Sequence, residues 1–174
     1  MMRGINVGGQ KIIRMENLRA SFEALGFRRV RSYVQSGNLV FEDSKTSTQT
    51  LSKNIKEKIL SDFGSSVPLV LRTSGDMKKI VNNNPFLKEN GIEHSKLHVT
   101  FLSEPPAVTA LKKLDALAPL PDRFHVEGRE VYLRCPNGYG RTKLSNAAFE
   151  RLLSVEATTR NWNTVNTLVG MSSE

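Results

Sequence analysis

The sequence predicts an α+β protein with two ferredoxin-like (split βαβ) lobes, over 1–75 and 76–174. Two observations predict this class. The first lobe reads as strand, helix, strand, strand, helix, strand, which is the order of that arrangement. The second lobe repeats the first five elements, but a C-terminal helix stands in place of its last strand, so we expect the second lobe to be irregular.

The first lobe is expected to begin with a short strand over 1–7 and an amphipathic helix over 15–25. Apolar residues recur in that helix at spacings of three and four, which is typical of one buried helix face. Gly26 follows the helix, where a left-handed C-cap is common. A second helix over 51–63 has an apolar residue at every fourth position, and 67–71 is expected to form the last strand.

Residues 29–42 are expected to form a β-hairpin around a two-residue turn at Ser36 and Gly37. That turn pairs Gln35 with Asn38, and directly opposed residues share a face of the sheet. The face expected to pack on the core holds Val30, Val34, Leu39 and Phe41. The opposite face, expected to meet solvent or a ligand, holds Arg29, Arg31, Tyr33, Gln35, Asn38, Val40 and Glu42.

The second lobe has a polar run with a proline at 82–85, which marks a junction between the lobes. A strand over 96–102, a helix opened by two prolines and a hairpin over 123–134 are expected to follow. Ser145 is expected to cap the next helix and Thr159 the last one, because both residue types are common N-caps.

The chain carries a formal net charge of +8, and this charge is uneven. Residues 1–75 hold 12 Lys and Arg against 6 Asp and Glu, whereas the rest of the chain holds 13 against 11. A basic lobe is typical of proteins that bind nucleic acid or a phosphorylated ligand, although solubility alone also explains it. No apolar run approaches the ~18 residues of a membrane span, so we expect no membrane partner.

Cys135 is the only cysteine, which excludes an internal disulfide and a cysteine-based metal cluster. A reducing cytoplasm is the simplest location for such a chain. His94, His98 and His125 are too scattered to pair on one helix, so we expect no metal site. The sequence also indicates no cofactor and no catalytic residue.

The candidate site lies where two turns are expected to meet. A right-handed crossover makes the first two strands of the lobe parallel, so their C-terminal ends share one sheet edge. That edge carries a pair of glycines and the hairpin turn. Glycine lets backbone amides approach a ligand, and a helix N-terminus favours an anion. The side of the lobe expected to bind an anionic ligand consists of Arg3, Asn6, Gly8, Gly9, Lys11, Gln35 and Asn38.

Cations also stand near the starts of two later helices, where a positive charge opposes the helix dipole. Lys143 leads into the helix that Ser145 caps, and Arg160 follows the expected cap Thr159. A bound phosphate or carboxylate would reverse the sign of this interaction. We therefore include Lys143, Arg160 and the neighbouring Asn161 among the expected ligand-binding residues.

Three functions are compatible with these residues. The first is binding of nucleic acid or a phosphorylated metabolite at the edge that carries Gly8 and Gly9. The second is an enzyme that acts on a phosphorylated or nucleotide substrate there, with Glu16 as the nearest carboxylate. The third is a structural protein whose exposed sheet edge recruits another chain. The glycine pair fits neither a P-loop nor the dinucleotide-binding fingerprint, and a tight turn explains it equally well.

Three blocks of the sequence carry a family resemblance: 3–9 (RGINVGG), 33–41 (YVQSGNLVF) and 158–165 (TTRNWNTV). With these blocks the chain resembles the bacterial family known as domain of unknown function 1697. The resemblance implies two small α+β lobes in a cytoplasmic bacterial protein, and it brings no established activity, cofactor or catalytic residue. Members of that family usually carry more apolar residues before the first block, so either the start site is misassigned or the first strand is short.

Overall fold

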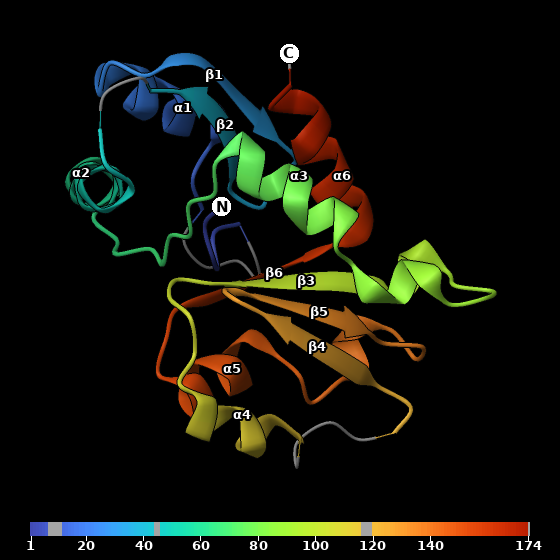
Figure 1. Ribbon diagram of the computed structural model, residues 1–174. Coiled ribbons are helices and arrows are strands. Elements are labelled where there is room, and N and C mark those ends of the chain that lie inside the picture. The colour runs from blue at the N-terminus through green and yellow to red at the C-terminus, as the bar shows by residue number, and fades with distance from the viewer. Residues whose placement is uncertain (7–11, 44–45, 116–119, 174) are drawn as a thin grey trace. The chain divides into compact units, whose positions relative to one another are not determined.

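The structure is a computed structural model that describes residues 1–6, 12–43, 46–115 and 120–173 (Figure 1). The chain divides into two compact units. The first unit holds Met1–Leu71 together with Met171–Glu174, and the second holds Arg72–Gly170. Helices and antiparallel sheets are mixed along the chain, so the α+β class is confirmed.

The first unit contains two helices and one hairpin in its described residues. Their bounds are α1 Met15–Ala24, β1 Arg28–Tyr33, β2 Asn38–Glu42 and α2 Thr48–Phe63. The strands expected over 1–7 and 67–71 are reduced to one antiparallel bridge between Met2 and Leu69. The first strand prediction was wrong because Gly4 and Asn6 take left-handed backbone angles, with φ of 72° and 56°, which end the extended segment.

The β1–β2 hairpin forms where expected but in a different register. Tyr33 pairs with Asn38, so the turn has four residues in place of two. Val34 leaves the predicted core face: its φ is +50° and it is 54% exposed. Asn38 leaves the predicted open face and is fully buried. A longer turn shifts the pairing by two residues, which changes the cross-strand partners but keeps the alternation of each strand next to the turn. Farther from the turn the register shifts again between Arg28 and Arg31, where Arg29 has a φ of +49°.

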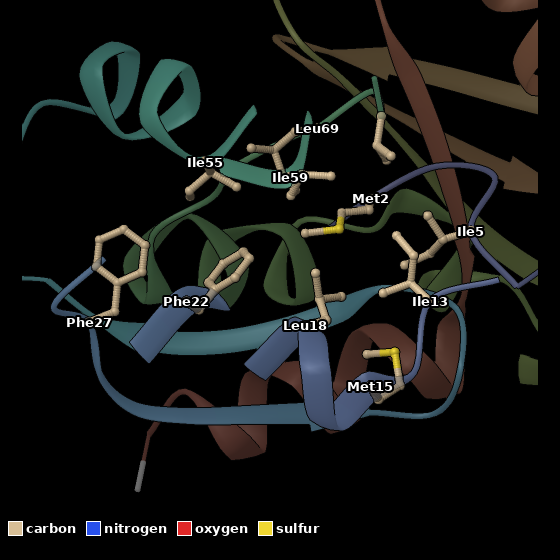
Figure 2. Close-up of a cluster of buried hydrophobic side chains, with 11 residues drawn as sticks. Met2, Ile5, Ile13, Met15, Leu18, Phe22, Phe27, Ile55, Ile59 and Leu69 are labelled. Carbon is tan, nitrogen blue, oxygen red and sulfur yellow. The ribbon is translucent and has the colours of Figure 1, made fainter. Parts of the chain in front are cut away.

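The core of the first unit joins both helices to the N-terminal segment (Figure 2). Its buried residues are Met2, Ile5, Ile13, Met15, Leu18, Phe22, Phe27, Ile55, Ile59, Val67 and Leu69. Phe41 of β2 packs on this core, stacked on Phe27 at 4.4 Å between ring centroids. Because Ile5 and Ile13 are both buried, the chain is anchored to the core on either side of Asn6 and the segment that follows it.

The second unit is built on a four-stranded antiparallel sheet of order β4-β5-β3-β6. The strands are β3 Leu97–Leu102, β4 Arg123–Glu127, β5 Glu130–Arg134 and β6 Ala157–Asn161. The helices are α3 Ser74–Asn82, α4 Val108–Asp115, α5 Asn146–Leu153 and α6 Trp162–Met171. The presence of β6 contradicts the prediction that a helix replaces the last strand.

The last helix begins later than predicted. Asn161, not Thr159, stands before α6, and its Oδ1 accepts a hydrogen bond from the backbone N–H of Thr164 at 2.8 Å. Thr159 instead lies in β6 opposite Thr100 of β3. The β-branched side chains at the start of this segment favour a strand, and the capping asparagine then starts the helix.

Helices cover both faces of this sheet (Figure 1). On one face, α4 and α5 pack with Leu133 and Phe149 in a buried apolar cluster. On the other face, the buried hydroxyl of Tyr132 donates to the carbonyl oxygen of Ile80 in α3 at 3.1 Å. In the described ranges, no helix is long and apolar enough to span a membrane.

Candidate functional site

The side chain of Asn6 joins two segments that are distant in sequence. Its Nδ2 donates to the carbonyl oxygens of Ile13 and Gln35, each at 2.8 Å. Its Oδ1 accepts from the backbone N–H of Ile13, also at 2.8 Å. The hairpin turn and the entrance to α1 therefore lie next to each other, although the first strand, whose parallel pairing was expected to bring them together, does not form. Gly8, Gly9 and Lys11 lie outside the described residues.

The turn between β1 and β2 is fixed from several sides. The buried Asn38 donates from Nδ2 to the carbonyl oxygen of Tyr33 at 3.2 Å and to Ser36 Oγ at 3.1 Å. The carbonyl oxygen of Gly37 accepts from the N–H of Met2 at 2.9 Å. The carboxamide hydrogens of Asn6 and the buried side chain of Asn38 thus stabilise the turn, whereas the side chain of Gln35 is exposed.

The N-terminus of α1 lies at this edge and has a cation before it. Arg14 occupies the N-cap position, is exposed, and makes no side-chain capping hydrogen bond. Glu16, also exposed, is the acidic residue in the first turn. Arg3 is half-buried, and its backbone N–H donates to the carbonyl oxygen of Pro68 at 3.0 Å. Unbonded helix amides here would favour an anion.

The other three predicted ligand-binding residues belong to the second unit. Lys143 is exposed in the loop before α5. Arg160 in β6 donates from Nη1 to Thr158 Oγ1 and to the carbonyl oxygen of Thr159, both at 2.8 Å. Burial lowers the pKa of Arg160 to about 10. Asn161 caps α6, because its Oδ1 accepts a hydrogen bond from the backbone N–H of Thr164.

The sequence reasoning missed a partly buried hydroxyl network in the second unit. Thr159 Oγ1 donates to Asn146 Oδ1 at 2.7 Å, lies 2.7 Å from Thr100 Oγ1, and accepts from the Tyr139 hydroxyl at 3.0 Å. The ring of His98 stacks on Tyr139 at 4.9 Å. Threonines on neighbouring strands give such contacts, but only when their pairing is known, and β6 was not predicted.

A second feature missed by the sequence reasoning is a charged hollow of about 210 Å³ between α3 and the β4–β5 turn. The half-buried Asp76 and Glu130 are among the residues that line it. Burial alone would raise the pKa of Asp76, but hydrogen bonds from Thr73 and the charges of Arg129 and Arg72 lower it. Acidic and basic residues both line this hollow, so it does not present the single sign of charge that would attract an ion.

The comparisons with known proteins identify the family and the fold. The family described as "Protein of unknown function (DUF1697)" matches residues 1–132. The chain belongs to this family. The DUF1697 chain also resembles a solved structure described as that of conserved bacterial protein SP0830 from Streptococcus pneumoniae, with a TM-score of 0.77 and 22% identity over 99% of this chain and 96% of that one. At this identity the likeness shows the fold alone. No curated protein matches.

Proposed function

We propose that the first unit binds an anionic ligand, either nucleic acid or a phosphorylated metabolite, at the edge where Asn6 links the hairpin turn to the start of α1. The observation that carries this proposal is the pair of 2.8 Å hydrogen bonds from Asn6 Nδ2 to Ile13 and Gln35. These bonds join the hairpin turn to the segment before α1, and Asn6 and Gln35 are 29 residues apart in the sequence. In the sequence, Gly8, Gly9 and Lys11 lie between Asn6 and Ile13.

The charges at this edge support an anion. A cation at a helix N-terminus costs about 0.3–1 kcal/mol when exposed, because it opposes the helix dipole. Arg14 stands at that position in α1. A bound phosphate would lie between the guanidinium and the helix amides and would be attracted by both. The excess of cations in residues 1–75 adds a longer-range attraction for the same ligands.

Two other functions remain alternatives to binding alone. An enzyme at this edge would need an acid, a base or a nucleophile in reach, and Glu16 is the described carboxylate at the start of α1. A protein that recruits another chain would use a free sheet edge, and measurement of the molar mass in solution tests that. We also propose a ferredoxin-like arrangement for the second unit, which the order β4-β5-β3-β6 supports, and a cytoplasmic location, which the single cysteine favours.

The test is a titration of fluorescent single-stranded RNA, single-stranded DNA and nucleotides at two salt concentrations. We expect binding at low salt that weakens as salt rises, because phosphate contacts release counterions. Arg14→Gln and Lys11→Ala should each weaken binding, since each removes a positive charge from the proposed edge.

The matched control is Lys53→Gln, which removes one positive charge from α2 of the same unit. The Lys53 side chain is 75% exposed and its Nζ lies 3.9 Å from Glu57 Oε1, so its loss should leave folding unchanged and should weaken ligand binding less than Arg14→Gln does. Absence of binding at low salt, or equal effects of Lys53→Gln and Arg14→Gln, would reject the proposed site.

A further inference from the structure

The strand β4 forms one edge of the sheet in the second unit (Figure 1). Its side chains alternate: Arg123, His125 and Glu127 are exposed, whereas Phe124 and Val126 are half-buried against the apolar cluster of α4 and α5. Among the residues that the structure describes, β5 is the one strand that pairs with β4. An edge of this kind presents main-chain N–H and C=O groups to which a strand of another chain can bond.

The main-chain groups on the outer side of β4 belong to Phe124 and Val126. Glu127 pairs with Glu130 across the two-residue loop that joins β4 to β5. Such a closing pair exchanges two hydrogen bonds, and bonded pairs recur at every second residue of an antiparallel ladder. The main chain of His125 is therefore directed toward β5, and that of its two neighbours is directed away from the sheet.

The charges of β4 are complementary to the same strand running in the opposite direction. When two copies pair antiparallel about His125, Phe124 of one copy lies opposite Val126 of the second, so the outward main-chain groups meet. In this register Arg123 of each copy lies opposite Glu127 of the other. Directly opposed residues share a face of the sheet, so the two charges come within reach of each other, once on each side of the twofold axis.

Other pairings of β4 with itself lack this match. A parallel arrangement in register sets Arg123 beside Arg123, and like charges on neighbouring strands are destabilising. An antiparallel arrangement shifted by two residues keeps main-chain bonds but loses both ion pairs. The opposite edge of the sheet, β6, has Arg160 as its charged residue, and that side chain bonds within its own strand. Charged residues on edge strands usually keep copies apart, but those of β4 leave one pairing favourable.

Both charged side chains have contacts in their own chain and retain capacity for a further partner. Arg123 Nη1 donates to Glu89 Oε1 at 2.7 Å, yet the Arg123 side chain is 52% exposed. Glu127 Oε1 accepts from Asn83 Nδ2 at 3.0 Å. A guanidinium has more donors, and a carboxylate more lone pairs, than these bonds use. The existing contacts restrict both side chains, which lowers the entropy that they would lose on pairing.

We propose that the chain forms a symmetric homodimer through β4, in which the sheets of two second units join into one continuous antiparallel sheet. The main-chain groups of Phe124 and Val126 supply hydrogen bonds, while Arg123 and Glu127 set the direction and the register. The contact is short, so the dimer forms at micromolar concentrations and exchanges with the monomer. This inference goes beyond the proposed function and does not depend on it, because all its residues belong to the second unit.

Sedimentation equilibrium of the full chain, from low to high micromolar concentration, measures the dimer dissociation constant. Glu127→Arg sets two arginines opposite each other on both sides of the axis and should raise this constant at least about tenfold. Adding Arg123→Glu restores opposite charges, so the double variant should return to within about threefold of the wild type. Glu57→Arg, at a side chain 64% exposed on α2, is the control charge reversal and should have little effect. Circular dichroism verifies that each variant is folded.

A cysteine cross-link tests the register. His125 faces its own copy in a pair without main-chain bonds, where the two Cα atoms lie about 4.5 Å apart. A disulfide spans that distance. His125→Cys should therefore give a covalent dimer on oxidation with copper–phenanthroline. Arg123→Cys is the matched control, because its two cysteines would lie roughly 14 Å apart. Cys135 is buried and is present in both variants.

Two kinds of result would overturn the proposal. A chain that stays monomeric at every concentration leaves β4 to a different partner or to none. A dimer that the double variant does not restore, or in which Arg123→Cys cross-links as fast as His125→Cys, uses another surface or another register. The titration with nucleic acids and nucleotides is a separate measurement, so failure of the dimer and failure of the anion site are distinguishable.

Discussion

A Cβ atom on Gly37 would lie 2.7 Å from Cδ1 of Ile5, closer than a Cβ contact allows. Gly37 also has a φ of +75°, which favours glycine. We expect Gly37→Ala to destabilise the protein by about 2–4 kcal/mol, from the left-handed backbone and the overpacked core together. Urea denaturation followed by circular dichroism measures this loss.

Gly64→Ala is the matched control for that substitution. Gly64 caps α2 with a φ of +65°, but nothing lies within 4 Å of an added Cβ. It should therefore show only the backbone effect, about 1–2 kcal/mol. Equal losses for the two variants would show that the contact with Ile5 relaxes at no cost.

The carboxamide of Asn6 should stabilise the edge that carries the proposed site. Asn6→Gly keeps the left-handed backbone of this residue, whose φ is 56°, and removes three hydrogen bonds. The expected loss is about 1–3 kcal/mol, because the groups left behind lose their partners. Asn6→Asp retains the acceptor for the N–H of Ile13 but sets a carboxylate oxygen against the carbonyl oxygens of Ile13 and Gln35, so it should lose at least as much. Thermal denaturation ranks the variants, and the reverse order would contradict the assigned bonds.

The hairpin shows which features of this edge the sequence predicts and which it does not. The period of the apolar residues located β1 and β2, and Val30, Leu39 and Phe41 do pack on the core. The register was wrong because it depends on turn length, and the four-residue turn requires a left-handed Val34 that no propensity favours. The inward side chain of Asn38 follows from that turn and so was missed as well.

The strand β6 was not predicted from the sequence, for a different reason. Its residues are mostly polar, so the segment offers no apolar alternation, and Thr159 was read as a helix cap. In the structure, the Thr159 hydroxyl is satisfied by Thr100, Tyr139 and Asn146, which come from three other parts of the second unit. A polar strand with partners of this kind is visible only after the sheet is assembled.

The buried ion pair between Arg72 and Glu130 should matter more than exposed pairs. Arg72 Nε donates to Glu130 Oε1 at 2.6 Å, and the two side chains are 1% and 15% exposed. Glu130→Gln removes the carboxylate charge beside a buried guanidinium and should destabilise the protein by about 3–5 kcal/mol. In contrast, Glu42→Gln breaks the exposed Arg29–Glu42 pair and should cost less than about 1 kcal/mol. Guanidinium chloride titrations of both variants check this difference.

His98 should make stability depend on pH. Its side chain is 9% exposed, and its Nδ1 finds no hydrogen-bond partner among the described residues. Burial lowers the pKa of His98, and a hydrogen bond with the Lys96 backbone opposes this only in part. The native state thus takes up the proton less readily than the unfolded chain, whose histidine has an ordinary pKa of about 6.5. The contribution of the neutral His98 to the free energy of unfolding is therefore complete above the pKa of the unfolded chain. It is lost as the pH falls through the lower pKa of His98 in the native state.

The pH dependence can be assigned to His98 by substitution. We expect the free energy of unfolding in urea to fall between pH 7.5 and 5.5 in the wild type, and His98→Gln to reduce that fall, because glutamine cannot take up the proton. His94→Gln, at an exposed position of the same segment, should leave the pH dependence as it is. If His98→Gln keeps the full dependence on pH, other groups bind the protons on unfolding, and the buried imidazole is not responsible.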